Sequence, residues 1–594
     1  MGPPSAGDVR DAADRTRDRA TATTTRRPRD GDRRRRVRGS VALADDARRR
    51  RAREADAGLP VELPDRHPAD ARAGVGLRST PPERRNGLDA VTPRPDEFEH
   101  EAAGAEFDVT PDPLARLAAE ATEPETGVGP AEMDVSRRAP PRRLPDLTTG
   151  PIRSGVMLLA LPVLGEQLLN AGVAWNDTYL AGHLGAVATA AVGFGAYISW
   201  LISLLFSLVG IGATAIIARA VGAGRTRDAD EAANQAMTLA VLLALAAIVG
   251  MYWLAPPLVR LLGLSASAGP LATRFIRIDL VGYVPESLTF VGAACLRGAG
   301  DTRTPMKIMA AVNVINVLAT WGLTFGWGPL PELGAVGIAW GTVTARLLGG
   351  VLMTIILLRG RGGLRMSTDL LWPHGNWMRR ILRIGLPASI DSAIMWSGHF
   401  VFLAILTRAP TRWPDDVMFA AHIVGIRIES LSYLPALAWS VAASTMVGQN
   451  LGAGNPRRAL AAAREARNQA VGLLLLTGSL FFFGAETLFR FLSADPRVIE
   501  CGVPALRGLA FVQPFVATLI VYLGALRGAG DTTVPMLFTV LGFAGLRIPI
   551  AYLGGVVLEG GLVGVWSGMY VDLVARAALM AWRLRSGRWQ HARV

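Results

Sequence analysis

The feature that most constrains this chain is an internal duplication. The phrase LRGAGDTRTPM begins at Leu296, and the similar phrase LRGAGDTTVPM begins at Leu526, 230 residues later. A second phrase, Gly-Ala-Gly with two arginines close behind it, begins at Gly222 and again at Gly452, also 230 residues later. Two unrelated phrases at one offset indicate that a long unit of the chain occurs twice.

The first part of the chain differs in composition from the rest. Residues 1–150 are rich in Arg, Asp, Ala and Pro, whereas the 594-residue chain as a whole is 50% hydrophobic. Such a segment cannot bury enough apolar surface to offset its ordering entropy, so we expect 1–150 to be a disordered extension. Its arginines suit anionic lipid, but interleaved acids weaken that interpretation, and we expect no nucleic-acid partner. Translation from Met133 is an alternative start.

The remainder of the chain consists of apolar runs. From Ile152 onward Leu, Val, Ala, Gly and Ile dominate, in stretches of about 20 residues, the length that crosses a bilayer. Continuous apolar runs exclude barrel strands, whose side chains alternate in character. The sequence predicts an all-α integral membrane protein in the lipid bilayer. Twelve transmembrane helices are predicted at residues 154–178, 188–219, 234–258, 273–296, 306–328, 334–358, 384–407, 417–447, 469–492, 502–526, 535–557 and 562–583.

Charge and duplication together predict the topology. Arginines gather in the turns after the second, fourth, sixth, eighth and twelfth helices, so that side is expected to be cytoplasmic, with both termini. Six helices per repeat give two pseudo-symmetric lobes, 151–368 and 375–590, with a cavity between them. The duplicated glycine phrases are expected to be turns, with Asp301 and Asp531 at helix starts. We expect a monomer, multi-pass in the plasma membrane.

Several motifs resemble those of the multidrug and toxic compound extrusion (MATE) family. They are the repeated LRGAGDT-x-x-PM, the run MVGQNLGAGN from Met446, and the run NDTYLAGHLG from Asn176. The resemblance covers about residues 152–590. It implies twelve helices in two lobes and the export of organic, often cationic, small molecules in exchange for H⁺ or Na⁺. No cofactor other than the coupling ion is implied.

Carboxylates inside predicted helices are candidate functional groups, because an ionised one at mid-bilayer costs at least about 2.5–3.5 kcal/mol. Asp177 holds the family's first-helix aspartate position, which implies a cation-coupling group; a helix-end cap is the alternative. Asn316 and Thr342 resemble residues of a family cation site, although Thr320 replaces the acid of that site. Oxygen atoms of Asp177, Asn316 and Thr342 suit Na⁺, so a metal ion at Asp177 is possible. Loss of the acid equally suits Asp177 as a lone proton carrier.

A second set of residues is predicted to line the substrate cavity. Glu166 and Asp391 each lie four residues after a Leu-Pro pair, one in each repeat, so we expect both to face the central cavity. Two opposed carboxylates suit a cationic substrate; hydrogen bonding of each acid to a neighbouring amide is the alternative. Met395 and Trp396 can line a cavity that accepts varied ligands, although packing against lipid explains them equally well.

The predicted function is secondary antiport by alternating access, with an organic compound leaving as H⁺ or Na⁺ enters. A flippase or exporter of a lipid-linked or polysaccharide precursor is the alternative. It would need several cationic residues in the cavity, and the candidates named above are mainly acids. The sequence contains no HExxH or GxSxG phrase, so an enzyme is not expected.

Overall fold

The computed structural model describes residues 146–594 except 262, 361–362, 411, 414 and 593. Residues 1–145 of the predicted disordered extension, and the alternative start at Met133, therefore lie outside the described part. Residues 146–150, which the prediction placed in that extension, form a turn in which Leu147 is 3% exposed. The Leu147 carbonyl accepts a hydrogen bond from Asn450 at 3.3 Å, which ties this turn to the second repeat.

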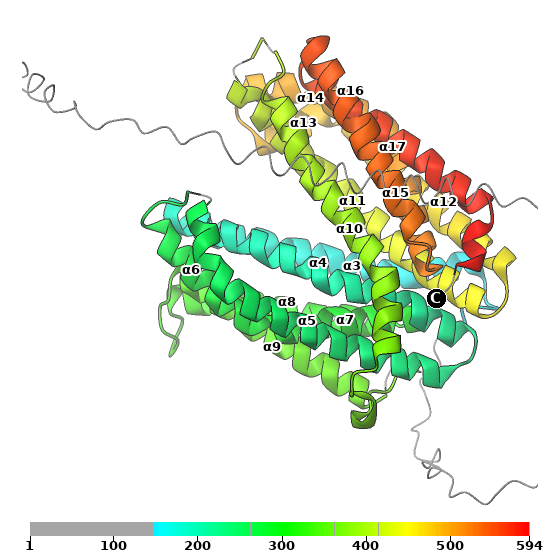
Figure 1. Cartoon of the computed structure of the whole chain (residues 1–594). Coiled ribbons are helices and arrows are strands. Elements are labelled where there is room, and N and C mark those ends of the chain that lie inside the picture. Colours follow the sequence, from blue (N-terminus) through cyan, green and yellow to red (C-terminus); the bar gives the residue numbers. More distant parts are fainter. Residues whose placement is uncertain (1–145, 262, 361–362, 411, 414, 593) are drawn as a thin grey trace, which may run out of the picture. The chain divides into compact units, whose positions relative to one another are not determined.

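All the described secondary structure is helical (Figure 1). Because lipid offers no hydrogen-bond partners, helices satisfy their own backbone groups within each span. The elements of the first repeat are α3 (Ile152–His183), α4 (Ala186–Gly222), α5 (Thr226–Leu261), α6 (Ala268–Asp279), η2 (Leu280–Gly282), α7 (Tyr283–Ala299), α8 (Arg303–Phe325), α9 (Ala335–Leu358) and η4 (Thr368–Leu370). Those of the second are α10 (Gly375–Leu406), α11 (Asp415–Gly452), α12 (Pro456–Phe483), α13 (Ala485–Leu492), α14 (Pro496–Gly528), α15 (Thr533–Gly542), η5 (Phe543–Arg547), α16 (Ile548–Tyr552), η6 (Leu553–Val557), α17 (Gly561–Arg585) and η7 (Arg588–His591).

The helices confirm an all-α membrane protein, but not twelve clear spans. Among the described residues, ten helices are long and apolar enough to cross a membrane. An eleventh is obtained if α12 and α13, bent by 76° relative to each other, count as one span. The predicted helix at 273–296 is instead divided into α6, the short 3₁₀ turn η2 and α7. This region carries Asp279 and Glu286, so its composition departs from that of an uninterrupted apolar span.

The duplicated glycine phrases form turns, as the sequence predicts. Gly224 and its counterpart Gly454 both have φ +72°, and Gly300 and Gly530 have φ +98° and +83°. These left-handed conformations favour glycine, because a Cβ atom would strain them. Similar φ angles at equivalent glycines show that both repeats use the same turns.

The two predicted helix-start aspartates behave differently. Asp301 accepts hydrogen bonds from the backbone N–H groups of Arg303 and Thr304 at 3.1 and 3.0 Å, as a residue before a helix does. Asp531 instead accepts from the Arg583 guanidinium at 2.7 Å, so it links α17 to the turn before α15. The helix-start role is confirmed for the first aspartate only.

Of the three hydrophobic cores among the described helices, the two larger ones each take in a helix from the other repeat. One core contains residues between 191 and 384, including Ile381 and Ile384 at the start of α10. The other contains residues from 402 onward together with Val156, Leu159 and Val163 at the start of α3. The first helix of each repeat is therefore packed, at its beginning, into the core of the opposite half.

Glycine allows the halves to approach closely at one end. A Cβ atom on Gly222 would lie 1.9 Å from the carbonyl oxygen of Gln449, and one on Gly452 would lie 2.1 Å from that of Arg219. Gly222 and Gly452 are equivalent in the duplication, and they end α4 and α11. These glycines are required because the two helix ends touch through their backbones.

Candidate functional site

A polar cavity of about 490 Å³ lies among α3, α7, α8 and α9, all in the first half. Asp177, Asn316 and Thr342, the three residues predicted to couple the cation, all line this cavity, as does Glu166. They come from α3, α8 and α9, so only helix packing brings them together. Asp391 does not line it, because α10 lies in the other half.

Asp177 has a weak set of partners. The Asn176 amide lies 3.4 Å from the Asp177 carboxylate and 3.4 Å from the Thr320 hydroxyl. The side-chain oxygen of Asn176 is itself held by the Trp321 indole N–H at 2.8 Å. Within the described part of the chain, Asp177 forms no ion pair. A half-buried carboxylate with one long hydrogen bond is free to take up a proton or a cation.

Asn316 and Thr342 lie on the same cavity wall. The Asn316 amide donates to the Thr342 hydroxyl at 3.3 Å, and Asn316 is 4% exposed. Its carbonyl oxygen is buried without a hydrogen-bond partner among the described residues. An unpartnered amide oxygen beside a hydroxyl, in a cavity that the Asp177 carboxylate also lines, is a suitable donor set for a hard cation. Nearby, Asn313 donates to Asn170 at 3.0 Å and extends the polar wall.

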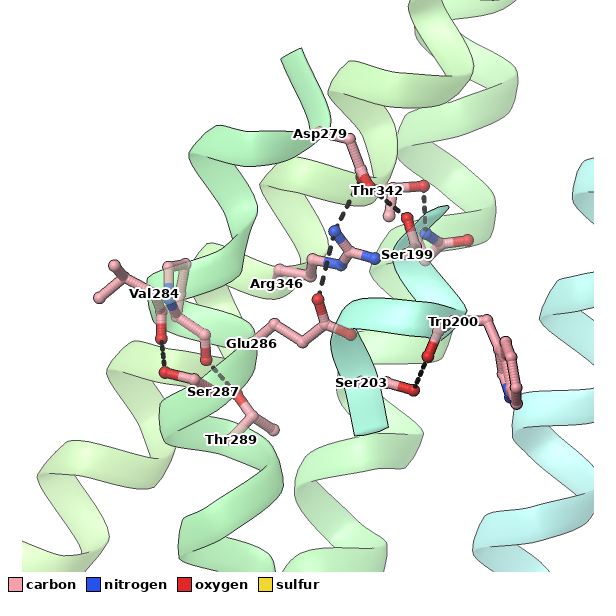
Figure 2. Close-up of polar contacts among 12 residues, drawn as sticks. Ser199, Trp200, Ser203, Asp279, Val284, Glu286, Ser287, Thr289, Thr342 and Arg346 are labelled. Atoms are coloured by element: carbon pink, nitrogen blue, oxygen red, sulfur yellow. Dashed lines mark hydrogen bonds and ion pairs between the residues drawn. The ribbon is translucent and has the colours of Figure 1, made fainter. Parts of the chain in front are cut away.

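A buried ionic cluster extends the site beyond the predicted residues (Figure 2). Arg346 of α9 lies between two acids: its Nη1 is 2.8 Å from Asp279 and 3.4 Å from Glu286. Ser199 of α4 also donates to Asp279 at 2.5 Å, and the guanidinium lies 5.5 Å from the Tyr283 ring centroid. Glu286 and Arg346 line the cavity that holds the coupling candidates. One guanidinium thus forms ion pairs with two carboxylates.

The predicted pair of cavity acids is held by the duplicated motif. Glu166 lies 3.3 Å from Arg297, and Asp391 lies 2.7 Å from Arg527. Arg297 and Arg527 are the arginines of the two LRGAGD phrases, so equivalent residues make equivalent ion pairs. The predicted alternative, a neighbouring amide as the partner, is wrong for both acids. An acid already paired with a guanidinium attracts a cationic ligand less than an unpaired acid would.

Comparison with known proteins shows which family has this arrangement of residues. The MatE family model matches residues 162–321 and, a second time, residues 387–553. The "Probable multidrug resistance protein NorM" of Thermotoga maritima is 30% identical over 448 residues, covering 75% of this chain and 95% of that protein. The chain belongs to the MATE family. This membership confirms the resemblance seen in the sequence, and it identifies a multi-pass membrane transporter rather than an enzyme.

Two other MATE proteins are also similar to most of this chain. The "Multidrug resistance protein PmpM" of Pseudomonas aeruginosa is 26% identical over 442 residues, 73% of this chain and 91% of that protein. A solved structure, described as the outward-facing conformation of a multidrug resistance MATE family transporter of the MOP superfamily, superimposes with a TM-score of 0.69. It is 22% identical and covers 74% of this chain and 98% of its own. That likeness shows the MATE fold.

Met395 and Trp396, the other predicted cavity residues, lie outside the polar cavity. The Met395 sulfur accepts a contact from Arg576 at 3.3 Å, and Trp396 packs on Trp200 with ring centroids 4.3 Å apart. Trp396 is 45% exposed. Trp200 belongs to α4, so this aromatic pair joins the two halves of the MATE transporter.

The residues that sequence reasoning missed are the arginines. The sequence alone points to no role for Arg346, Asp279 or Glu286, and it places Arg297 only in a glycine-rich turn. The available signal was an arginine within an otherwise apolar helix, which is as costly in a membrane as an aspartate. Each such arginine predicts a carboxylate partner, although not which one.

Proposed function

We propose that this MATE transporter exports organic compounds, cationic or amphipathic, across the cytoplasmic membrane in exchange for H⁺ or Na⁺. Asp177 is the coupling carboxylate, and Asn316 and Thr342 assist it. Glu166 and Asp391, together with their arginines, tune the charge of the substrate path. The names of the relatives as multidrug resistance proteins support a broad range of organic substrates.

The observation that carries this proposal is the convergence of Asp177, Asn316 and Thr342 on one cavity. Asp177 has no ion-pair partner among the described residues, and the Asn316 oxygen has no hydrogen-bond donor. Both features leave acceptor capacity for a proton or for Na⁺. A membrane potential favours entry of that cation by about 2.3 kcal/mol per charge per 100 mV.

The first helix of each repeat packs into the core of the opposite half, and this arrangement supports alternating access. The two six-helix lobes, 151–368 and 375–590, are the moving units of the proposal, and the basic ends of the helices lie on the cytoplasmic side. Because the start of α3 packs into the core of the second half, while Asp177 near its other end lines the first-half cavity, α3 contacts both lobes. Cation binding at Asp177 changes the packing of α3 and thereby the affinity of the cavity for substrate.

Reconstitution tests the proposal. Proteoliposomes that contain the full-length protein are loaded with a fluorescent cationic dye, and H⁺ or Na⁺ gradients are imposed in separate runs. One gradient is expected to drive dye export, and Asp177→Asn is expected to reduce the gradient-driven rate to background. Asp228→Asn, an exposed acid paired with Arg225, is the matched control and should retain transport. Full gradient-driven export by Asp177→Asn would refute the coupling role.

One observation favours keeping a second function in the test. Arg297 and Arg346 line the cavity, and cationic residues there are what a flippase for a lipid-linked or polysaccharide precursor requires. Each of them is matched by a carboxylate, which argues against a net positive site. Dye that stays in place under both gradients, with translocation of a lipid-linked saccharide instead, would support this alternative.

A further inference from the structure

A second, smaller cavity lies among α12, α14 and α17, with a volume of about 170 Å³. Three arginines line it: Arg464 and Arg467 of α12 and Arg585 of α17. Arg585 is the last residue of α17, and Arg464 lies near the start of α12, so the cavity is at the end of the bundle. This depth corresponds to the headgroup region rather than to the centre of a bilayer.

The three arginines lack carboxylate partners in the part of the chain that the structure describes. Neighbouring arginines are different: Arg583, two residues before Arg585, is held by Asp531 at 2.7 Å. The Arg467 guanidinium lies over the Tyr522 ring, 5.8 Å from its centroid, and its buried Nε has no hydrogen-bond acceptor. Three guanidinium groups around one small space repel each other unless an anion lies between them.

The duplication supplies an internal comparison. The residues 230 positions before Arg464 and Arg467 are Asn234 and Met237, which carry no charge. Asn234 uses its amide to hold the backbone of Asp230 and Arg365 at 2.7 and 3.3 Å. The arginine-lined cavity is therefore not part of the shared repeat design, and the common fold of the two halves does not explain it.

We propose that this cavity binds a phosphate group, carried by the headgroup of an anionic phospholipid or by a free phosphate compound. Arginine suits this ligand because its planar guanidinium donates paired hydrogen bonds to phosphate oxygens. Basic pockets between transmembrane helices are a recurrent form of lipid recognition. Trp582, three residues before Arg585, is 55% exposed, and tryptophan is enriched at the membrane interface. The proposal does not depend on Asp177 or on the coupling ion.

The test measures binding to the purified full-length protein in detergent. Native mass spectrometry follows titration with phosphatidylglycerol, with phosphatidylcholine and with inorganic phosphate in separate arms. Wild type is expected to retain phosphatidylglycerol, and Arg467→Gln to bind it about tenfold more weakly, the loss expected for one charge-assisted contact. The triple variant Arg464→Gln/Arg467→Gln/Arg585→Gln should lose saturable binding. Arg457→Gln, an exposed arginine of α12 outside the cavity, is the matched control.

Each outcome of the binding experiment either supports or overturns the proposed phosphate site. Arginine-dependent binding of phosphatidylglycerol alone assigns the site to a lipid headgroup, and equal binding or competition by inorganic phosphate assigns it to a free phosphate compound. Equal lipid binding by wild type, Arg457→Gln and the triple variant would overturn the proposal. If the triple variant does not fold, Arg585→Gln at the helix end carries the same comparison. Gradient-driven dye export, measured in parallel, reports separately on the transport proposal.

Discussion

In the first half of this transporter Arg346 lies between two carboxylates, whereas in the second half Asp572 lies between two guanidiniums. Arg346 contacts Asp279 and Glu286 at 2.8 and 3.4 Å. Asp572 contacts Arg547 and Arg576 at 2.8 and 2.6 Å. The ionic cluster of the first half is therefore centred on a cation, and that of the second half is centred on an anion.

The difference lies in what surrounds each cluster. Asp572 is fully buried, and its two partners Arg547 and Arg576 are only 7% and 4% exposed. The first-half cluster instead borders the polar cavity, where Asp177 adds a third carboxylate, whereas the other arginine of the cavity, Arg297, is paired with Glu166. The second cluster is a closed structural contact. The first leaves excess negative charge beside a space that a cation can enter, which is the arrangement that the proposed coupling requires.

The largest expected effect on stability is at the closed cluster. Asp572→Asn leaves two buried guanidiniums beside each other, so we expect a loss of about 3–5 kcal/mol in the free energy of unfolding. Denaturant-driven unfolding of the detergent-solubilised protein measures this loss. Glu500→Gln, which removes an exposed pair with Arg412, should change it by less than about 1 kcal/mol. Equal small losses in both variants would show that the second-half cluster is not a structural contact.

Arg346→Gln is expected to destabilise less, by about 2–3 kcal/mol, although it also removes a shared ion. The cavity admits water, which hydrates the released Glu286, and Asp279 keeps its hydrogen bond from Ser199, whereas the second-half cluster has no exposed face. The same unfolding experiment compares the two variants directly. A loss that equals or exceeds that of Asp572→Asn would contradict the distinction between an open and a closed cluster.

The equivalent motif pairs offer an intermediate comparison. Asp391→Asn removes an ion pair of 2.7 Å and Glu166→Gln one of 3.3 Å, so we expect losses of about 2 and 1 kcal/mol. Thermal unfolding monitored by size-exclusion chromatography ranks the two variants. The reverse order would mean that burial of the arginine, rather than the length of the contact, determines the contribution.

Asp177→Asn should have the smallest effect, below about 0.5 kcal/mol in the free energy of unfolding, because the half-buried side chain keeps its size and loses only one weak hydrogen bond. The melting temperature is therefore expected to match wild type while gradient-driven export is lost. This separation of stability from transport distinguishes a coupling group from a structural one. A substantial loss of stability would make Asp177 a helix-end cap, the alternative that the sequence left open.

Much of the architecture was predictable because it depends on local or repeated features. Apolar runs predicted helices in all twelve ranges, and the glycine phrases predicted turns whose equivalent residues have nearly equal φ angles. Asp177, Asn316 and Thr342 were named through their resemblance to MATE residues, and the structure brings them to one cavity. The break at η2 was missed because periodic hydrophobicity does not report a short 3₁₀ turn.

The sequence by itself determined the helices, the duplication and the presence of charges that need partners in a membrane. Only the tertiary structure decided the pairing: Glu166 meets Arg297 across 131 residues, and Asp391 meets Arg527 across 136. It also decided that Arg464, Arg467 and Arg585 share one cavity. Helix formation follows from residues within a few turns of one another, whereas a partner is selected by which helix faces meet. That selection depends on how all the helices pack together.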